Sequence, residues 1–298
     1  MKLESSKQLA LMANSMRQDV IRMLVPAASG HTAGPLGMAD IFSILFFHEM
    51  KYNAAQPKWE GRDRFVLSNG HICPILYSAM ARAGFFPLEE LSTLRKLGSR
   101  LQGHPSMAKL PGIENSSGPL GEGLAIACGM ALSGRMDKAD WRVYCATSDG
   151  EHQEGSTWEA VMLAAKYKLD NLVAICDRNG IQIDGKTEDV MPLLDMAEKY
   201  RAFGWHAIEV DGHDYAAIMR ALDEARATKG KPTMIIAKTV PGKGVSFMEN
   251  DYKWHGVAPK PDDAAKALAE LEAERAKIEQ SEGLRGTSGL GSKRIGAE

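Results

Sequence analysis

Two oxygen-bearing side chains, Asp149 and Asn179, follow apolar segments that have the composition of buried strands. They lie 30 positions apart (179 − 149 = 30), which leaves room for one helix between them. Carboxylate and amide oxygens suit a hard divalent cation such as Mg²⁺, which completes its octahedron with phosphate oxygens and water. Glycines at 150 and 155 would let a diphosphate approach the backbone, close to a helix that begins near Ser156. The alternative is an ordinary Asp-Gly turn, the more common outcome for this dipeptide after a strand.

The histidines are the second group that could do chemistry, because most of them adjoin a glycine. His31, His71, His104 and His213 each follow a glycine, and His255 precedes one. Histidine can donate to phosphate or move protons near neutral pH, and an adjacent glycine lets its loop come close to a ligand. Several such pairs favour a shared pocket, although a single pair is more often structural. We expect His213 to be structural, beside Asp214 at a helix start, and His48, His152 and His206 to be surface or core residues.

From residue 142 onward, segments with strand and helix patterns alternate regularly. Strands are expected at 142–148, 171–177, 205–210 and 233–238, and helices at 156–168, 192–203 and 214–229. Such alternation requires crossover connections, so the pattern predicts an α/β fold with a parallel sheet flanked by helices on both faces. Ligands bind beyond the carboxyl ends of such strands, where Asp149, residues 177–179 and residues 239–244 all fall. This coincidence favours a ligand site over a set of plain turns.

The first 140 residues are expected to be mainly helical, with one short strand at 64–68. Helices are expected at 5–25, capped by Ser5 or Ser6 and followed by Pro26, at 38–49, and at 119–136 with Pro119 in its first turn. Ser156 and Glu159 have the spacing of a capping box for the helix after Asp149. We expect residues 1–260 to form one domain, and residues 261–298 to form a C-terminal helix at about 262–280 and a flexible tail.

The overall composition is that of a globular protein and argues against two classes of function. The chain has 298 residues, 44% of them hydrophobic, and a formal net charge of −2, so it offers no basic surface for nucleic acid. The N-terminal segment has no uninterrupted apolar run that could serve as a signal peptide or membrane span. Four widely spaced cysteines without a CxxC pair favour free thiols in a reducing compartment, so we expect a cytoplasmic protein.

Seven segments together resemble the thiamine diphosphate-binding half of transketolase. They are SGHTAGPLGMADI (29–41), DRFVLSNGH (63–71), GHP (103–105), SSGPLGEGLAIACGMAL (116–132), SDGEHQEGSTWEA (148–160), NGIQIDG (179–185) and WHGVAP (254–259). Their order and spacing are similar to the family's over about residues 5–260, and most of all to the N-terminal subunit of split transketolases. The resemblance implies a thiamine diphosphate-binding fold of the PP type and transfer of a two-carbon ketol unit from a ketose phosphate to an aldose.

The resemblance also implies roles for individual residues. Asp149, Asn179 and the backbone carbonyl of Ile181 would bind Mg²⁺. The cofactor would contact His71, Gly118, Pro119, Leu120, Asp149, Gly150, Asn179, Ile181 and His255. His31, His104 and His255 would be the catalytic residues that face the thiazolium and the sugar, bind hydroxyls and move protons. Glu154 and Glu159 match acidic positions near the family's subunit interface, although exposed first-turn carboxylates favoured by the helix dipole explain them equally well.

Two departures from the family pattern affect these expectations. Ser148 replaces the first glycine of the family's usual GDG, and we expect it to adjust the loop without abolishing the metal site. The family's glutamate that protonates the aminopyrimidine belongs to a following domain that this sequence does not contain. The resemblance therefore implies a partner chain with the pyrimidine-binding domain, in an assembly with two copies of each chain (α2β2).

Other functions stay open at this point. The nearest alternatives are related thiamine diphosphate enzymes, of the 1-deoxyxylulose-5-phosphate synthase type or the α subunit of a 2-oxoacid dehydrogenase. The set of His31, His104 and His255 favours transketolase over both. A non-catalytic cofactor-binding or regulatory subunit is the alternative from a different class, and the presence of Asp149 and Asn179 argues against it. The sequence does not identify the sugar, which could be a pentose phosphate, a branched sugar phosphate or a sulfonated sugar.

Overall fold

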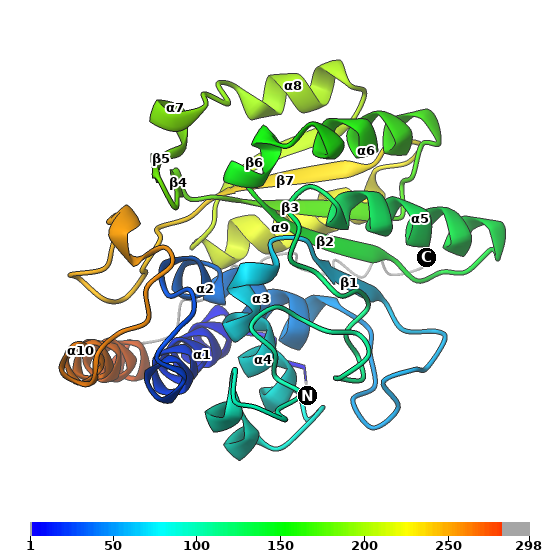
Figure 1. The fold of residues 1–298 in the computed structure, drawn as a ribbon. Helices are drawn as coiled ribbons and strands as arrows, with labels where there is room; N and C mark the ends of the chain where they lie inside the picture. Colours follow the sequence, from blue (N-terminus) through cyan, green and yellow to red (C-terminus); the bar gives the residue numbers. More distant parts are fainter. Residues whose placement is uncertain (1, 282–298) are drawn as a thin grey trace, which may run out of the picture.

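A parallel sheet forms the centre of the protein in a computed structural model that describes residues 2–281 (Figure 1). The strand order is β1-β2-β3-β7-β6, and every neighbouring pair is parallel. The strands are β1 (Arg64–Leu67), β2 (Val143–Ser148), β3 (Leu172–Arg178), β6 (His206–Asp211) and β7 (Thr233–Lys238). Met1 and residues 282–298 lie outside the described residues, and so does the tail expected there. The expected parallel α/β fold is confirmed.

Helices cover both faces of this sheet, which explains why its central strands are apolar along their whole length. One face packs against α5 (Gly123–Met136), α6 (Gly155–Lys166) and α8 (Met196–Ala202). The other face packs against α1 (Ser6–Ala27), α3 (Ala39–Ile44), α4 (Cys73–Arg82) and α9 (Tyr215–Ala227). Successive residues of a strand point to opposite faces of the sheet. In β2, Tyr144 packs on the side of α1, and Val143 and Cys145 pack on the side of α5.

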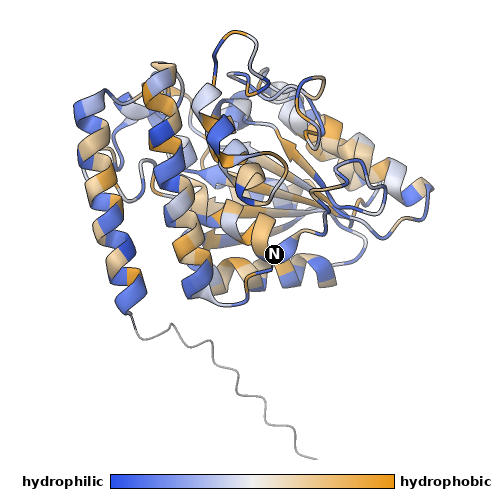
Figure 2. Ribbon diagram, turned by 90° about the horizontal axis from the view of Figure 1, so that it is seen from below, coloured by the Kyte–Doolittle hydropathy of each residue, from blue (hydrophilic) through white to orange (hydrophobic). Residues whose placement is uncertain are grey.

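The long helix α10 (Pro261–Gln280) lies beside α1, as Figures 1 and 2 both show. In Figure 2, hydrophobic and hydrophilic residues alternate along these two helices, the pattern of helices that bury one face. Polar contacts add to the packing, because Asn14 Nδ2 donates to the carbonyl of Leu271 at 2.9 Å and Arg275 donates to Ser15 Oγ at 2.9 Å. The helix expected at 262–280 is therefore present and joined to the main body.

The structure corrects several expected helix ends. Ser5 caps α1 through a capping box with Gln8, as expected, but the helix continues through Pro26 to Ala27 and ends where Ala28 is left-handed (φ 50°). The segment expected as helix 38–49 consists of α3 and a π-helical turn, η1 (Leu45–Glu49), and a short helix α2 (Ala33–Gly37) precedes it. The capping box of Ser156 with Glu159 does not form, because α6 already begins at Gly155.

The helix expected from Pro119 begins only at Gly123, so Pro119 lies in a loop. Gly121 interrupts a helical path there with φ +84°, and a Cβ at this residue would lie 2.3 Å from Ser156 Oγ. Glycine alone adopts this conformation without strain and fits this close approach. The chain therefore turns at Leu120 and Gly121, and α5 begins only after this turn.

Short elements occupy the connections around the sheet. They are η2 (Gly70–Ile72), η3 (Leu88–Thr93), η4 (Gly150–Gln153), β4 (Ile181–Gln182), β5 (Gly185–Lys186), α7 (Thr187–Val190) and η5 (Tyr252–Trp254). Cys73, Cys128, Cys145 and Cys176 are free and buried, as expected for core thiols. Within residues 2–281, every helix is too short or too polar to span a bilayer.

Candidate active site

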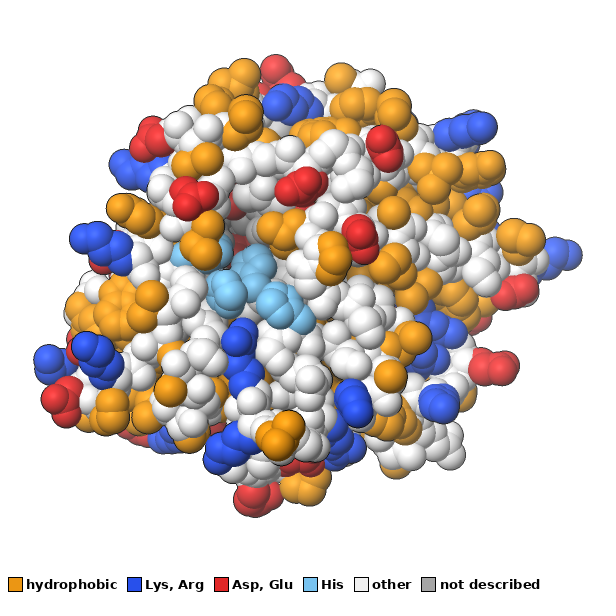
Figure 3. Space-filling view, in the orientation of Figure 1, with side chains coloured by type: hydrophobic (Ala, Val, Ile, Leu, Met, Phe, Trp, Pro, Cys, Tyr) orange, Lys and Arg blue, Asp and Glu red, His pale blue; other side chains and the backbone are white. Residues whose placement is uncertain are grey.

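A cleft at the carboxyl ends of the strands brings the expected site residues together. Its volume is about 340 Å³, which lies within the range of small-molecule sites. Nine of the expected site residues line it: His31, His71, His104, Gly118, Leu120, Gly150, Asn179, Ile181 and His255. Figure 3 shows histidine side chains gathered at this hollow. Of the remaining two, Asp149 is fully buried and Pro119 is exposed on the loop between Gly118 and Leu120.

Asp149 joins the ends of β2 and β3 through hydrogen bonds to the two chain neighbours of Asn179. Asp149 Oδ2 accepts the N–H of Gly180 at 2.7 Å and Arg178 Nη1 at 3.2 Å, and its Oδ1 accepts the N–H of Gly150 at 2.8 Å. Asn179 Oδ1 accepts the N–H of Ile181 at 3.0 Å. Burial raises the pKa of Asp149, while its backbone donors and Arg178 act in the opposite direction.

The donor set at this position fits Mg²⁺. Oδ1 of Asp149 and Oδ1 of Asn179 each accept one hydrogen bond, so each oxygen keeps a lone pair for a cation. With the carbonyl of Ile181, the ligands would all be oxygen atoms, as a hard cation requires. Residues 2–281 contain no group of three or more His, Cys, Asp and Glu side chains placed to hold a metal, so a softer transition-metal site of that kind is not present in this part of the chain.

Three histidines form a compact triangle in the cleft. Ring centroids lie 4.9 Å apart for His31 and His71, 5.4 Å for His31 and His255, and 5.2 Å for His71 and His255. The Nδ1 atoms of His31 and His255 are buried without a hydrogen-bond partner among the described residues. Unpaired buried polar atoms are costly, so these two nitrogens fit a site that a polar ligand completes.

Burial keeps the histidines of the cleft neutral. It lowers the pKa of His31 to about 4, with smaller contributions from His255, Arg95 and His104, and it lowers the pKa of His71 well below the ordinary value. The pKa values of His104 and His255 are lowered by burial as well. A neutral imidazole can both donate and accept a proton, so the cleft contains groups that can bind hydroxyls and move protons at pH 7.

These depressed pKa values predict a loss of stability in mild acid. In the unfolded chain His31 binds a proton below its ordinary pKa of 6.5, whereas the folded chain resists protonation until about pH 4. Stability should therefore be complete above pH 6.5 and fall as the pH decreases toward 4, with a slope of up to about 1.4 kcal/mol per pH unit for each such group. Melting temperatures of the native chain and of His31→Gln between pH 7 and pH 5 would test this.

Between pH 7 and pH 5, the melting temperature of His31→Gln should fall less per pH unit than that of the native chain. His206→Gln is the matched control, because His206 lies on β6 and pairs with Glu224 at 2.7 Å, outside the cleft. Equal slopes for the native chain and His31→Gln would contradict the assignment of a neutral buried His31.

The sequence did not reveal Glu151, which is fully buried beside the cleft. Its carboxylate accepts hydrogen bonds from the hydroxyl of Ser68, from the N–H of Gly121 at 2.8 Å and from the N–H of Ser148 at 3.2 Å. These three residues belong to the loops after β1, before α5 and at the end of β2. Glu151 therefore joins the segment with the cleft-lining residues Gly118 and Leu120 to the segment with Asp149.

Arg95 is a second residue that the sequence did not single out. Its positive charge contributes to the lowered pKa values of His31 and His104, and its Nη2 donates to the carbonyl of Gly103 at 3.3 Å. It is the cationic side chain that acts on both of these histidines. No motif marks it in the sequence, because it follows η3 in a segment without periodicity.

The residues expected to be structural are found in structural contacts. His213 Nδ1 contacts Asp40 Oδ2 at 2.7 Å, and its Nε2 accepts the N–H of Val240 at 2.8 Å, while Asp214 caps α9. His152 is a core residue that contacts the carbonyl of Ser148 and the hydroxyl of Tyr200, each at 2.7 Å. Glu154 lines the cleft at the start of α6.

Ser148 and Glu159 are also placed by the structure. Ser148 is buried at the end of β2, with its N–H bonded to Glu151 and its carbonyl to His152, so the backbone just before Asp149 is held by these two side chains. Glu159 lies exposed on α6.

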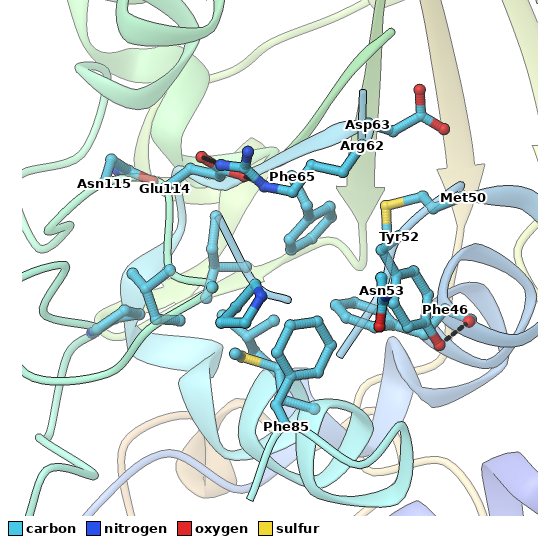
Figure 4. A pocket seen from close by; sticks show the side chains of 17 residues that line it. Phe46, Met50, Tyr52, Asn53, Arg62, Asp63, Phe65, Phe85, Glu114 and Asn115 are labelled. Atoms are coloured by element: carbon cyan, nitrogen blue, oxygen red, sulfur yellow. Dashed lines mark hydrogen bonds and ion pairs between the residues drawn. The ribbon is translucent and has the colours of Figure 1, made fainter. Parts of the chain in front are cut away.

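A second cavity is lined by aromatic rings but does not suit a cofactor. Figure 4 shows Phe65, Phe85 and Tyr52 around it, with Arg62 beside Glu114 at its edge. Its volume of about 30 Å³ suits one or two water molecules. This cavity lies behind the loop of Pro105 and Asn115 and shares no lining residue with the cleft.

Comparisons with known proteins agree with the geometry. The family described as "Transketolase, thiamine diphosphate binding domain" matches residues 8–280. An apulose-4-phosphate transketolase subunit of Phocaeicola vulgatus is 40% identical over 272 residues, which are 91% of this chain and 96% of that protein. The 6-deoxy-6-sulfo-D-fructose transketolase subunit SqwG of Clostridium sp. is 40% identical over 273 residues, which are 92% of this chain and 99% of that protein.

A solved structure matches the same fold. Transketolase from Pichia stipitis, in complex with sedoheptulose-7-phosphate, superposes with a TM-score of 0.83 and 33% identity. The match covers 92% of this chain and 45% of that chain, so this chain spans less than half of the solved transketolase. The chain therefore belongs to the transketolase family and carries its thiamine diphosphate-binding domain.

Proposed function

We propose that the chain is the N-terminal subunit of a two-chain transketolase, which transfers a two-carbon ketol unit from a ketose phosphate to an aldose. One observation carries the proposal: a single cleft joins the ends of β2 and β3, with Asp149 and Asn179, to the triangle of His31, His71 and His255. The first pair suits a magnesium-bound diphosphate, and the histidines suit a hydroxylated substrate.

The residues of the cleft divide into two functions. Asp149, Asn179 and the carbonyl of Ile181 would hold Mg²⁺, and His71 with the loop of Gly118, Pro119 and Leu120 would hold the cofactor. When bound, thiamine diphosphate supplies the electron sink for breaking and forming carbon–carbon bonds.

The remaining histidines would act on the substrate. His31, His104 and His255 would bind its hydroxyl groups and transfer protons at its oxygen atoms, since their lowered pKa values keep them neutral. Placing protons at these oxygens is the contribution of this chain's own side chains to the reaction.

The partner in this proposal is a chain with the pyrimidine-binding domain, in an α2β2 assembly. Thiamine chemistry requires a carboxylic acid at the aminopyrimidine, which the partner would supply. Exposed apolar side chains beside the cleft support an interface there, because Ile183 is 64% exposed, Met191 58% and Leu194 71%. Glu154, at the edge of the cleft, and Glu159 would lie near this interface.

The chain would have two parts and would work in the cytoplasm. Residues 1–260 would form the thiamine diphosphate-binding domain, and residues 261–298 would be a C-terminal addition that begins with α10. The four free, buried cysteines fit a reducing compartment, and we place the protein in the cytoplasm.

Reconstitution tests this function. The purified chain should transfer no ketol group alone, whereas a mixture with a C-terminal transketolase chain, Mg²⁺ and thiamine diphosphate should convert a ketose phosphate and an aldose. The two relatives are named for apulose-4-phosphate and 6-deoxy-6-sulfo-D-fructose, so phosphorylated and sulfonated ketoses should both be tried as donors.

The same assay separates the alternatives. Consumption of pyruvate in place of ketose would favour the other thiamine diphosphate enzymes. Magnesium-dependent cofactor binding without transfer in any pair would favour a non-catalytic subunit. Normal transfer by the chain alone would contradict the need for a partner.

A further inference from the structure

Asp177 is a buried carboxylate at the end of β3 that the proposed function leaves without a role. It is 1% exposed, so its charge is poorly solvated. Its Oδ1 accepts the hydroxyl of Thr239, and its Oδ2 accepts Asn179 Nδ2 at 2.8 Å. Burial raises the pKa of Asp177 to about 7, against the hydrogen bond from Thr239. An apolar residue could be buried at this position with a smaller loss of solvation free energy. The hydrogen bonds that the carboxylate accepts are therefore the reason for its presence.

The carboxylate determines which way the side-chain amide of Asn179 points. An amide has a donor end and an acceptor end of nearly the same shape, so packing alone does not distinguish its two orientations. Asp177 accepts from the NH₂ end of Asn179. The oxygen end is then on the other side, where it accepts the N–H of Ile181 at 3.0 Å and keeps a lone pair. A flipped amide would present its NH₂ group to a cation and repel it.

Thr239 supports Asp177 from the neighbouring strand β7. The residue after it, Val240, donates its N–H to His213 Nε2 at 2.8 Å, and His213 contacts Asp40 at 2.7 Å. Asp40 in turn forms a buried ion pair with Arg17 at 2.5 Å. The hydroxyl of Thr239 is therefore attached to a rigid part of the core, and a rigid support is what orients a ligand for a metal.

We propose that Asp177, held by Thr239, is a positioning residue that orients the amide oxygen of Asn179 toward a bound magnesium ion. It contacts neither the ion nor the substrate and acts only through Asn179. The inference rests on the proposed function, because it takes Asn179 as a magnesium ligand. Groups that orient metal ligands in this way change metal affinity by about 10- to 100-fold when they are removed.

Two substitutions at the same position separate orientation from packing. Asp177→Leu keeps the branched shape at Cγ, although its methyl groups are larger than oxygen atoms, and it cannot accept from Asn179. Asp177→Asn retains a carbonyl oxygen for Asn179 Nδ2, and its own amide can donate to the hydroxyl of Thr239. Thr239→Val removes the support and leaves the carboxylate in place. Asp223→Leu is the control, since Asp223 lies exposed on α9 and contacts Arg226 rather than Asn179 or the residues that support Thr239.

The measurement is the Mg²⁺ concentration that gives half-maximal binding of thiamine diphosphate, followed by tryptophan fluorescence in the full chain with its partner. We expect Asp177→Leu to raise it by about 10- to 100-fold. For Asp177→Asn the required Mg²⁺ concentration should stay within about threefold of the native value. Thr239→Val should raise this concentration about fivefold, which corresponds to the loss of one hydrogen bond. Asp223→Leu should leave the required Mg²⁺ concentration unchanged. At saturating Mg²⁺ the transfer rate of Asp177→Leu should recover.

Two results would overturn the inference. One is an unchanged Mg²⁺ requirement in a folded Asp177→Leu chain. The other is an Asp177→Asn chain that requires as much Mg²⁺ as Asp177→Leu. That result would assign the effect to the charge of Asp177 and not to the orientation of Asn179. If Asp177→Leu does not fold, as judged by circular dichroism, an unchanged requirement in Thr239→Val overturns the inference in its place. Failure of the proposed function is distinguishable, because the native chain itself would then bind the cofactor without Mg²⁺ or not at all.

Discussion

Asp149→Asn should weaken Mg²⁺-dependent binding of thiamine diphosphate by about 10²- to 10³-fold, the usual cost of removing one partner of a buried charge pair. Asp149 would supply the only charged ligand among the three expected magnesium ligands, and it is fully buried. The amide would also place an NH₂ group near donors, since the carboxylate accepts from Gly150, Gly180 and Arg178. Calorimetric titration of the cofactor into the reconstituted pair, at fixed Mg²⁺, measures the change.

A nearby substitution of the same kind provides the control. Asp189 is exposed on α7, so Asp189→Asn removes the same charge without touching the ligands and should bind the cofactor normally. Melting of both variants without cofactor shows whether each is folded. Unchanged affinity in a folded Asp149→Asn chain would exclude the ends of β2 and β3 as the metal site.

His255→Ala should lower turnover of the reconstituted pair by about 10²- to 10⁴-fold, the usual contribution of general acid–base catalysis. Cofactor affinity should change much less, because the proposed magnesium ligands Asp149 and Asn179 follow β2 and β3 and stay in place. His255 is suited to proton transfer, since burial lowers its pKa and its Nδ1 has no partner among the described residues. Steady-state kinetics gives kcat, and titration gives the cofactor affinity of the same preparation.

The triangle of rings adds a second expectation for the same experiment. His31 and His255 lie 5.4 Å apart, so the double variant should lose less than the product of the two single losses, as groups that act together do. His206→Ala, on β6, should keep full turnover. A His255→Ala chain with native kcat would remove His255 from the reaction.

The sequence predicts the sheet well, because alternation of apolar strands with amphipathic helices is a local property. The strands at 142–148, 171–177, 205–210 and 233–238 all appear within one residue of their expected ends. The ends of helices were harder to predict, because they depend on contacts with other segments. Pro119 has the features of a helix start, but the chain turns at the left-handed Gly121, whose N–H bonds to Glu151, 30 residues away.

Some residues of the candidate site could be predicted from the sequence and others could not. Asp149, Asn179 and the histidines beside glycines could be found because residue type and neighbours mark them. Glu151 could not, since it bonds to Ser68, 83 residues away. The sequence places Asp177 and Thr239 at the same edge of the sheet, but it does not predict the contact between them across 62 residues. A buried carboxylate that binds backbone and hydroxyl groups of other loops leaves no spacing pattern.

The three-way contact of Glu151 has a consequence for how the site fluctuates. Ser68, Gly121 and Ser148 reach the same two carboxylate oxygens from two loops and the end of β2. Freeing any one of them leaves part of a fully buried anion unsolvated, which raises the cost of local opening. The amide protons of Gly121 and Ser148 should therefore exchange with solvent through one shared opening event, and the wall of the cleft behaves as a single cooperative unit.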